Sequence, residues 1–492
     1  FTGTDQFIYV IGDDTATVAL TVEDRVWFID NNAAACTSVA SGCGRLSSPF
    51  SSLAAFGTAN TGTGNDPGDG DVVFLHESTS AYTGPLTLRA GQVLVGQDAA
   101  ASLAAIAGLT PGASSEPFPA MTPADGTHAT ITGGSGGIVL GTNNTLRGLT
   151  VATTGGTAIS GSAFGTLTLA GDVDVDASGG PALSLSNGAF SGAFRSVAAD
   201  GGANGIVLSS TTGTFTVAGT GTAGTGGTIQ NATDAGVSLT NTGPVELAWM
   251  TIQTNGGDGI TGSTVAGFTL RQSTVSGNGD AIGDHGLHFT ELTGTVRIDT
   301  TTVSGSGDDG VLVDNSSGTI DLTVIGSAFT DNATRHLAFE AAGSAGGAVT
   351  VADNDFSGGG SGILVIGEEE PADWSGAITY DIHDNRLSAS GGVSILAELR
   401  ESTSSATMTG HIRDNALGTT TVACNTGGPG IQVAGEGGGT HTVAVTGNTL
   451  RGCQQDAISA YAAAGSATLN LTVQSNGVTD VSFFGGFLLL MG

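Results

Sequence analysis

The sequence predicts a solenoid of short parallel β-strands, and three observations support this fold class. A phrase of Gly and an alternating apolar triplet recurs from residue 137 onwards, first as Gly137-Ile138-Val139-Leu140. Twelve steps lead from Ile138 to Ile458, so one repeat takes about 27 residues. Strand-sized repeats of this length bury their apolar face only against their neighbours. Hydrophobic residues make up 39% of the chain and alternate with polar ones, which excludes a disordered Gly-rich chain.

The apolar residue that follows the repeated Gly is expected to anchor each coil. The looser copies of the phrase are centred on Ile159, Leu183, Ile260, Leu337, Val393 and Ile458. We expect one inward-facing column that contains Ile138, Ile206, Val237, Val311, Ile363, Ile431 and Ile458. Gly486-Phe487-Leu488 follows at the same spacing and predicts one more coil.

Residues 1–22 differ from the repeats and predict a hairpin with one apolar face. Phe7 and Tyr9 alternate with polar residues before a turn at Gly12-Asp13-Asp14, and Val18 and Leu20 alternate after it. The segments Gly3-Thr4-Asp5-Gln6-Phe7-Ile8-Tyr9-Val10 and Thr17-Val18-Ala19-Leu20-Thr21-Val22 resemble the closing strands of bacterial cadherin-like or Ig-like tandem domains. This resemblance implies a large bacterial surface protein.

Residues 23–130 predict the first coils and the cap of the solenoid. The segments concerned are Val26-Trp27-Phe28-Ile29-Asp30-Asn31, the turn from Gly44 to Phe50, a short helix at Leu53-Ala54, Gly70 to Leu75, Tyr82 to Leu88 and Gln92 to Gln97. This succession resembles the start of a right-handed parallel β-helix of the pectate-lyase-like superfamily. The resemblance implies an all-β, right-handed, single-stranded β-helix with a capping helix. Residues 98–128 are expected to form a lateral insertion, and residues 131–492 the remaining coils.

A second repeated element is an Asn before an apolar residue. It occurs at Asn143-Asn144, Asn354, Asn385, Asn415 and Asn448. Asn tolerates left-handed backbone and hydrogen-bonds local backbone groups, so we expect these residues to occupy stacked tight turns.

The charge balance is strongly acidic. The chain has 44 acidic residues and 12 basic ones, and its formal net charge is −32. All 12 basic residues are Arg. Such a surface repels nucleic acids and anionic membranes, so neither is an expected partner. No apolar stretch is long enough to predict membrane insertion.

The four cysteines are expected to form two disulfides. Cys36 and Cys43 bracket a short loop, whereas Cys424 and Cys453 lie about one repeat apart and therefore on adjacent coils. Neither pair has the spacing of a zinc site. Disulfides favour an extracellular or cell-surface location.

The strongest catalytic candidates are Asp284, His285, Asp308 and Asp309. They occur in Asp284-His285-Gly286 and Gly307-Asp308-Asp309-Gly310, which lie one coil apart and resemble the paired Asp and Gly-His-Gly of polygalacturonases. However, the Asn-Thr-Asp and Arg-Ile-Lys elements of that family are missing. We therefore favour a structural interpretation in which these Asp residues occupy the polar turn before each anchor strand. Arg335 follows one coil later as a weak candidate for the base of a lyase.

No cofactor is expected, apart from a possible calcium site. Asp258, Asp284, Asp308 and Asp309 are the weak candidates for calcium ligands, because Ca²⁺ prefers several oxygen ligands. No nonapeptide calcium-binding array accompanies them.

The sequence as a whole favours a non-enzymatic extracellular β-helix of a bacterial surface or secreted protein. It would act as a stalk, a fibre element or an adhesive, ligand-presenting rod. The alternative is a polysaccharide-active lyase or hydrolase, or a depolymerase that resembles phage tailspikes. The expected partners are other domains of a longer parent chain or head-to-tail copies of itself, and a surface polysaccharide.

Overall fold

The computed structural model describes residues 3–11, 14–22, 25–112, 115–123, 125–368, 374–402, 405–481 and 485–491. The chain clusters into two compact units. The first comprises residues 1–199 with 211–215, and the second comprises residues 200–210 with 216–492. The predicted domain boundaries at residues 22 and 130 stay predictions. Within the described residues, no helix is long and apolar enough to cross a membrane.

The first unit starts with the predicted hairpin. Strand β1 (Gly3–Ile11) pairs antiparallel with β2 (Asp14–Val22), which places Tyr9 opposite Ala16. The turn at residues 12–13 and the side chains of the predicted apolar face lie outside the described residues. The resemblance of this hairpin to an Ig-like domain stays a prediction.

The rest of the first unit forms parallel coils with two short helices. Its strands are β3 (Val26–Ile29), β4 (Val72–Leu75), β5 (Tyr82–Thr83), β6 (Leu86–Thr87), β7 (Val93–Gly96), β8 (Thr130–Gly133), β9 (Ile138–Val139), β10 (Thr145–Arg147), β11 (Leu149–Thr153), β12 (Ile159–Thr168), β13 (Val173–Ser178) and β14 (Leu183–Ser191). Strands β3, β4, β7 and β10 pair in parallel in that order, as do β9, β12 and β14, and also β5, β8, β11 and β13. Strands β15 (Ser196–Asp200) and β16 (Ile206–Thr212) fall where the chain passes from one unit to the other.

Both helices lie where the sequence predicts helical structure or an insertion. Helix α1 (Leu53–Ala59) begins after Ser52, whose side chain accepts a hydrogen bond from the Ala55 amide at 3.1 Å. Its Phe56 is fully buried and contacts Phe50 edge-on. Helix α2 (Leu103–Ile106) lies in the predicted insertion, where Leu103 packs into a buried cluster with Phe28 and Phe74 of the strands. A 3₁₀ turn, η1 (Val39–Ser41), lies between β3 and α1.

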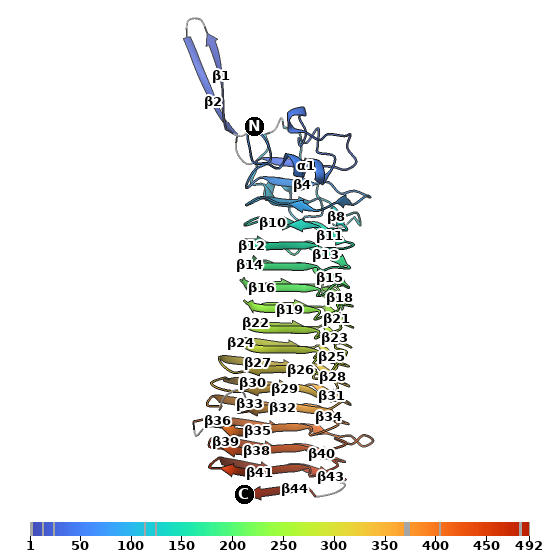
Figure 1. Ribbon diagram of the computed structural model, residues 1–492, viewed down its shortest axis with the longest axis vertical. Helices are drawn as coiled ribbons and strands as arrows, with labels where there is room; N and C mark the ends of the chain where they lie inside the picture. Colours follow the sequence, from blue (N-terminus) through green and yellow to red (C-terminus); the bar gives the residue numbers. More distant parts are fainter. Residues whose placement is uncertain are drawn as a thin grey trace. The chain divides into compact units, whose positions relative to one another are not determined.

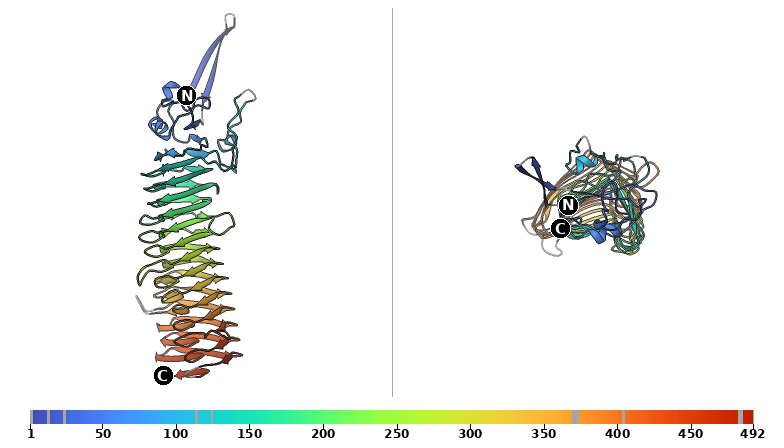
Figure 2. Two further views of the ribbon diagram at one scale, coloured as in Figure 1. Left: turned by 90° about the vertical axis from the view of Figure 1, so that its right-hand side faces the viewer. Right: turned by 90° about the horizontal axis from the view of Figure 1, so that it is seen from above.

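The second unit repeats one coil many times (Figures 1 and 2). Its strands are β17 (Phe215–Val217), β18 (Gly227–Gln230), β19 (Val237–Thr242), β20 (Val245–Ala248), β21 (Met250–Gln253), β22 (Ile260–Arg271), β23 (Thr274–Ser276), β24 (Leu287–Asp299), β25 (Thr302–Ser304), β26 (Val311–Asn315), β27 (Thr319–Ile325), β28 (Ala328–Thr330), β29 (Arg335–Ala341), β30 (Gly346–Ala352), β31 (Asp355–Ser357), β32 (Ser361–Gly367), β33 (Ala377–His383), β34 (Arg386–Ser388), β35 (Ile395–Ser402), β36 (Thr407–Arg413), β37 (Ala416–Leu417), β38 (Ile431–Gly437), β39 (Thr440–Thr446), β40 (Thr449–Arg451), β41 (Ile458–Gly465), β42 (Thr468–Gln474), β43 (Gly477–Thr479) and β44 (Phe487–Met491). One short strand of each coil belongs to a single parallel sheet, in the order β18, β21, β23, β25, β28, β31, β34, β37, β40 and β43. The other strands pair in parallel with their counterparts in the next coil.

The predicted column of inward anchors is present within each unit. In the second unit the register joins Val237, Ile260, Leu287, Val311, Leu337, Ile363, Ile395, Ile431, Ile458 and Phe487 in succession. In the first unit it joins Ile138, Ile159 and Leu183. The anchors from Ile138 to Ile458 are at most 2% exposed. The predicted anchor Val393 was wrong. The anchor of this coil is Ile395, and Val393 packs against an apolar cluster on the outer face.

Asn143 has the predicted left-handed backbone, with φ of 59°, but the Asn residues of the later coils form a buried ladder without occupying the left-handed positions. The main-chain amides of Asn354, Asn385 and Asn415 each donate to the side-chain oxygen of the Asn in the next coil at 3.0 Å. The left-handed residue is the one before each of these, with φ of 57° at Asp353 and Asp384 and 56° at Asp414. The physical reason is that the Asn side chain points inward, where it binds a backbone amide and a backbone carbonyl of the preceding coil.

Both predicted disulfides are confirmed. Cys36 and Cys43 are joined with their Cα atoms 5.5 Å apart, and Cys424 and Cys453 with theirs 5.1 Å apart. The second bond links two consecutive coils, whose strands β37 and β40 pair directly.

Candidate functional site

An apolar strip lies on the outer face of β26, β29, β32 and β35. Leu312, Ala338, Leu364 and Leu396 follow one another in register, and each is the residue directly after an inward anchor. Side chains alternate between the two faces of a strand, so these residues point away from the interior. They are nevertheless 0–8% exposed and cluster with Ile366. We call these five residues the apolar floor, and their low exposure shows that neighbouring side chains cover most of it.

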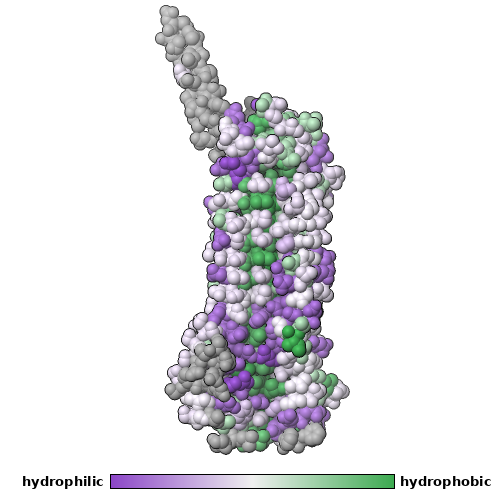
Figure 3. Space-filling view, viewed as in Figure 1, coloured by the Kyte–Doolittle hydropathy of each residue, from purple (hydrophilic) through white to green (hydrophobic). Residues whose placement is uncertain are grey.

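A row of acidic side chains runs beside the apolar floor, two residues further along each strand. In register, the row contains Asp314 of β26, Glu340 of β29, Ile366 of β32 and Glu398 of β35. We call Asp314, Glu340 and Glu398 the acid row. Figure 3 views this face and shows hydrophilic residues gathered beside an apolar stripe at the level of these strands.

Arg335 links the acid row to a buried carboxylate. Its Nε and Nη2 donate to the two oxygens of Asp309 at 2.9 and 2.7 Å, and its Nη1 donates to Glu340. The Asp309 side chain is only 1% exposed. Burial alone would lower the pKa of the Arg335 guanidinium, but the hydrogen bonds to Asp309 and the charge of Glu340 outweigh it and raise this pKa. Arg335 is therefore a fixed cation between two carboxylates.

Two carboxyl groups near Arg335 are shifted towards their protonated forms. Burial, followed by the charge of Glu340, raises the pKa of Asp314. The same two causes, in the same order, raise the pKa of Glu368, which directly follows β32. Partly buried carboxyl groups with raised pKa values are typical of sites that donate protons.

A second charged group surrounds Glu398 at the other end of the row. Arg400 Nη2 donates to Glu398 at 2.5 Å, and its Nη1 lies 3.5 Å from Glu368. Tyr461 reaches back across one coil, and its hydroxyl donates to Glu398 at 2.9 Å. Burial and the charge of Glu398 raise the pKa of Tyr461 to about 12, so the hydroxyl keeps its proton at neutral pH. Ile366 of the apolar floor lies in register between the two charged groups.

Two imidazoles lie at the start of the same face. The rings of His285 and His288 are 4.6 Å apart. His288 Nδ1 lies 3.7 Å from Asp258 Oδ2, and His285 Nδ1 lies 3.6 Å from Asp309 Oδ2. Burial and the charge of His288 lower the pKa of His285, whereas the hydrogen bond to Asp258 raises that of His288. The two rings are therefore shifted in opposite directions, His285 towards its neutral form and His288 towards its protonated form.

The four catalytic candidates from the sequence have different surroundings. His285 and Asp309 lie together beneath the outer face, as described above. Asp284 Oδ2 instead accepts the amides of Asp280 and Ala281 at 3.3 and 3.1 Å, and Asp308 Oδ2 accepts the amide of Gly283 at 2.9 Å. The Asp284 contacts lie within its own turn and the Asp308 contact joins two consecutive turns, which fits the structural interpretation for both residues, while the roles of all four stay untested.

Sequence reasoning missed most of the site. The missed residues are His288, Asp314, Glu340, Glu368, Glu398, Arg400 and Tyr461. A signal was present, because Asp314, Glu340, Glu398 and Tyr461 each stand three residues after an inward anchor. Aligning the repeats on their anchors would have placed these polar side chains in one outward row.

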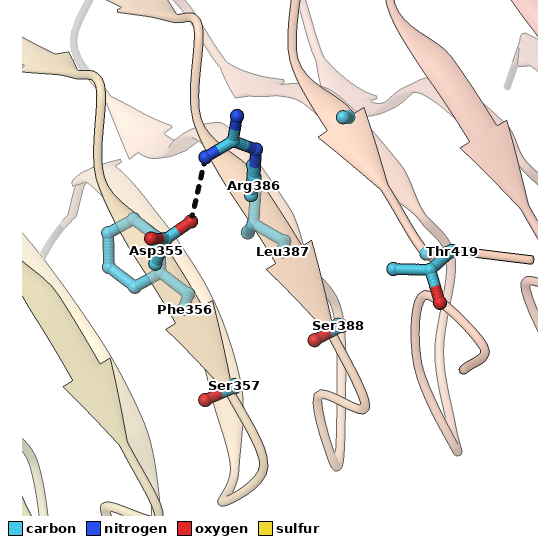
Figure 4. Close-up of a pocket in the computed structure, with 9 residues that line it drawn as sticks. Asp355, Phe356, Ser357, Arg386, Leu387, Ser388 and Thr419 are labelled. Atoms are coloured by element: carbon cyan, nitrogen blue, oxygen red, sulfur yellow. Dashed lines mark ion pairs between the residues drawn. The ribbon is translucent and has the colours of Figure 1, made fainter. Parts of the chain in front are cut away.

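A second depression lies on the sheet of short strands, between β31, β34 and β37 (Figure 4). It has a volume of ≈ 380 Å³, and its lining includes Phe356, Leu387 and the ion pair of Arg386 with Asp355. These two charged side chains are 81% and 64% exposed, with 3.7 Å between them. An ion pair so exposed contributes little, and neither ionisable residue of the lining is buried.

Comparison with known proteins supports the fold. The family described as "Right handed beta helix region" matches residues 216–372, within the second unit. The predicted fold class, a right-handed parallel β-helix, is thereby confirmed. No curated protein matches the sequence.

Three similar solved structures are enzymes. The family 28 exopolygalacturonase of Yersinia enterocolitica is 12% identical, over 96% of this chain and 80% of its own, with a TM-score of 0.23. The mannuronan C-5 epimerase A-module of Azotobacter vinelandii is 13% identical, over 87% and 94%, with a TM-score of 0.21. A pectate lyase is 13% identical, over 92% and 80%, also with a TM-score of 0.21. Likenesses this distant carry no argument about the site or its chemistry.

Proposed function

We propose that this protein is an extracellular enzyme that cleaves glycosidic bonds of a polysaccharide along the acid row. The observation that carries the proposal is the register of Asp314 and Glu340, which stand directly opposite each other on adjacent strands beside the apolar floor. Neighbouring strands lie about 4.8 Å apart. Retaining glycoside hydrolases hold their two carboxyl groups roughly 5–5.5 Å apart, so the spacing of this pair suits that chemistry.

The environments of the two carboxyl groups suit different roles. Asp314 has a raised pKa and no hydrogen bond to Arg335 among those described, so it suits a proton donor to the glycosidic oxygen. Glu340 accepts a hydrogen bond from the Arg335 guanidinium, so it suits an ionised nucleophile.

In the reaction, Glu340 would form a bond to the anomeric carbon as the bond to the leaving oxygen breaks and that oxygen takes the Asp314 proton. Water then releases the sugar from Glu340 and returns a proton to Asp314. The apolar floor would pack against the sugar ring, and the second charged group around Glu398 would hydrogen-bond hydroxyls of a neighbouring sugar.

The two disulfides support a location outside the cell, where polysaccharides are available. The predicted non-enzymatic adhesive rod is the competing function. Such a rod has no use for a partly buried carboxyl group with a raised pKa, and it would bind a polysaccharide without turning it over. The predicted calcium site, the parent chain and the head-to-tail copies stay proposals that this function neither needs nor excludes.

The test is an assay of new reducing ends on a panel of neutral, anionic and amino-sugar polysaccharides. We expect turnover of at least one of them. Asp314→Asn and Glu340→Gln should each lower kcat by about 100-fold or more, because each removes an acid–base or nucleophilic group. Asp321→Asn is the matched control, since Asp321 is exposed on the neighbouring strand β27 and should leave kcat unchanged. Binding without turnover would favour the adhesive rod, and full activity of both active-site variants would refute the assigned residues.

A further inference from the structure

We propose that Asp258, His285 and His288 bind a divalent first-row transition-metal ion, for which Zn²⁺ is a suitable probe. This site is separate from Asp314 and Glu340 and does not depend on the proposed cleavage reaction. Each of the three residues offers one ligand atom, and these atoms all lie within 4.8 Å of one another.

The three ligands come from two consecutive coils. Asp258 directly precedes the coil of β22, and His285 and His288 lie at the start of β24, the strand that pairs with β22. The Asp258 carboxylate is held in place because its Oδ1 accepts the His285 amide at 2.6 Å. Its second oxygen faces His288, with 3.7 Å between Oδ2 and Nδ1. The backbone thus presents a carboxylate oxygen to two adjacent rings.

The spacing is close to that of a metal site. Around a tetrahedral ion with bonds of about 2.0–2.2 Å, the ligand atoms lie roughly 3.4 Å from one another. The separation of Asp258 and His288 is already near this value, and the full set needs to contract by little more than an ångström. The His288 side chain is 29% exposed and that of Asp258 13%, so an ion can reach the site from solvent. Three protein ligands would leave a fourth position for water.

A second shell orients His285. Its Nδ1 accepts a hydrogen bond from the Asp309 amide at 3.2 Å, and Asp309 Oδ2 lies 3.6 Å away. Asp309 is itself fixed by the two hydrogen bonds from Arg335. This edge of the ring is therefore taken, and Nε2 is left for the ion. For Nε2 to bind the ion, the ring proton must move to Nδ1, which gives up the hydrogen bond from the Asp309 amide and turns to the Asp309 carboxylate, as in the carboxylate–histidine–metal arrangements of known sites.

The ligand types select the class of ion. Two imidazole nitrogens and one carboxylate suit Zn²⁺, Co²⁺, Ni²⁺ or Cu²⁺, whereas Ca²⁺ and Mg²⁺ prefer sets made of oxygen atoms. The sequence suggested calcium at Asp258, Asp284, Asp308 and Asp309. Asp284 uses an oxygen for amides of its own turn, and Asp308 uses one for the Gly283 amide of the preceding turn. The atoms that converge with the Asp258 carboxylate are the nitrogens of His285 and His288.

The experiment is isothermal titration of the full chain, dialysed against EDTA and then metal-free buffer, with ZnCl₂ and separately with CaCl₂. We expect one Zn²⁺ per chain bound at this site, and much weaker binding of Ca²⁺. His288→Asn and Asp258→Asn should each lower the Zn²⁺ affinity by about 100-fold or more. Asp309→Asn should lower it by about 10–100-fold, the usual effect of losing an orienting carboxylate. Titration with CoCl₂ adds a spectroscopic readout, since a tetrahedral nitrogen–oxygen site gives visible absorption bands.

His383→Asn is the matched control, because His383 also lies beside two carboxylates, Asp381 and Asp384, but on the distant strand β33. It should bind Zn²⁺ as the unmodified chain does. Circular dichroism of each variant verifies folding. Absence of Zn²⁺ binding by the unmodified chain, equal affinity for Ca²⁺, or unchanged binding by folded His288→Asn would each overturn the proposal. Glu340→Gln should keep Zn²⁺ binding, so failure of the cleavage reaction and failure of the metal site are told apart.

Discussion

Acidification is expected to destabilise the second unit through one buried histidine, His441 of β39. The side chain is 0% exposed, and both ring nitrogens are engaged. Nδ1 lies 2.8 Å from the Ala434 carbonyl oxygen, which can only accept, so Nδ1 carries the proton. Nε2 therefore accepts from the Tyr380 hydroxyl, also at 2.8 Å. This network fits the neutral imidazole and leaves no place for a second ring proton.

The size of the effect follows from the pKa of His441. Burial lowers this pKa to about 4, against a small opposing effect of the Ala434 carbonyl, whereas the unfolded chain has the ordinary value of 6.5. Between these values the unfolded state binds more protons, so stability falls as the pH falls through this range. A shift of one pKa unit corresponds to about 1.4 kcal/mol, which gives a loss of about 2.5 kcal/mol between pH 7 and pH 4.5.

The assay is hydrogen-exchange mass spectrometry on peptides from β36 and β39, which reports the free energy of opening at each pH. His441→Gln keeps a donor and an acceptor in place but does not titrate, so its loss on acidification should be about 2.5 kcal/mol smaller. His411→Gln, at an exposed position of β36, is the control and should lose as much as the unmodified chain. Equal losses in all three proteins would refute a neutral, buried His441.

Three further predictions concern the coils and the site. Replacing Cys424 and Cys453 by Ser should lower the free energy of unfolding by about 3–4 kcal/mol, because their disulfide closes a loop with a sequence separation of 29. Denaturant titration without reductant measures this free energy. Asn415→Ala should cost about 3 kcal/mol in the same measurement, since it leaves the Asn385 amide and the Ile382 carbonyl of the preceding coil without these partners. Glu291→Gln should move the alkaline limb of the kcat/KM profile to lower pH. Burial and the charge of Glu340 raise the pKa of Asp314 most, the charge of Glu291 also raises it, and His288 and Arg335 lower it, so removing the Glu291 charge lowers this pKa. An unmoved limb would show that Asp314 does not set the alkaline limb.

The fold could be predicted because each coil repeats the same short sequence pattern. A Gly and an alternating apolar triplet give a short strand with one inward face, and the period brings each strand beside the next. The cysteine pairing followed from the same period, as Cys424 and Cys453 are separated by about one coil. The residues of the Asn ladder were predicted correctly, but the left-handed backbone predicted for them was wrong. The reason is that these Asn side chains make buried contacts between coils, which the sequence of a single turn does not reveal.

The candidate site could be predicted only in part, because its chemistry depends on burial and register together. Asp308 and Asp309 are neighbours in sequence, yet Asp309 is held beneath the outer face by Arg335 and Asp308 accepts the Gly283 amide in the turn of the preceding coil. Placing the anchor at Val393 instead of Ile395 kept the alternation of faces, since a shift of two residues leaves the strand pattern unchanged. The same shift moved Glu398 from the third to the fifth position after the anchor and so removed it from the acid row. In a solenoid, a two-residue error in register can preserve the alternation of inward and outward side chains and still hide the residues that act together on the outside.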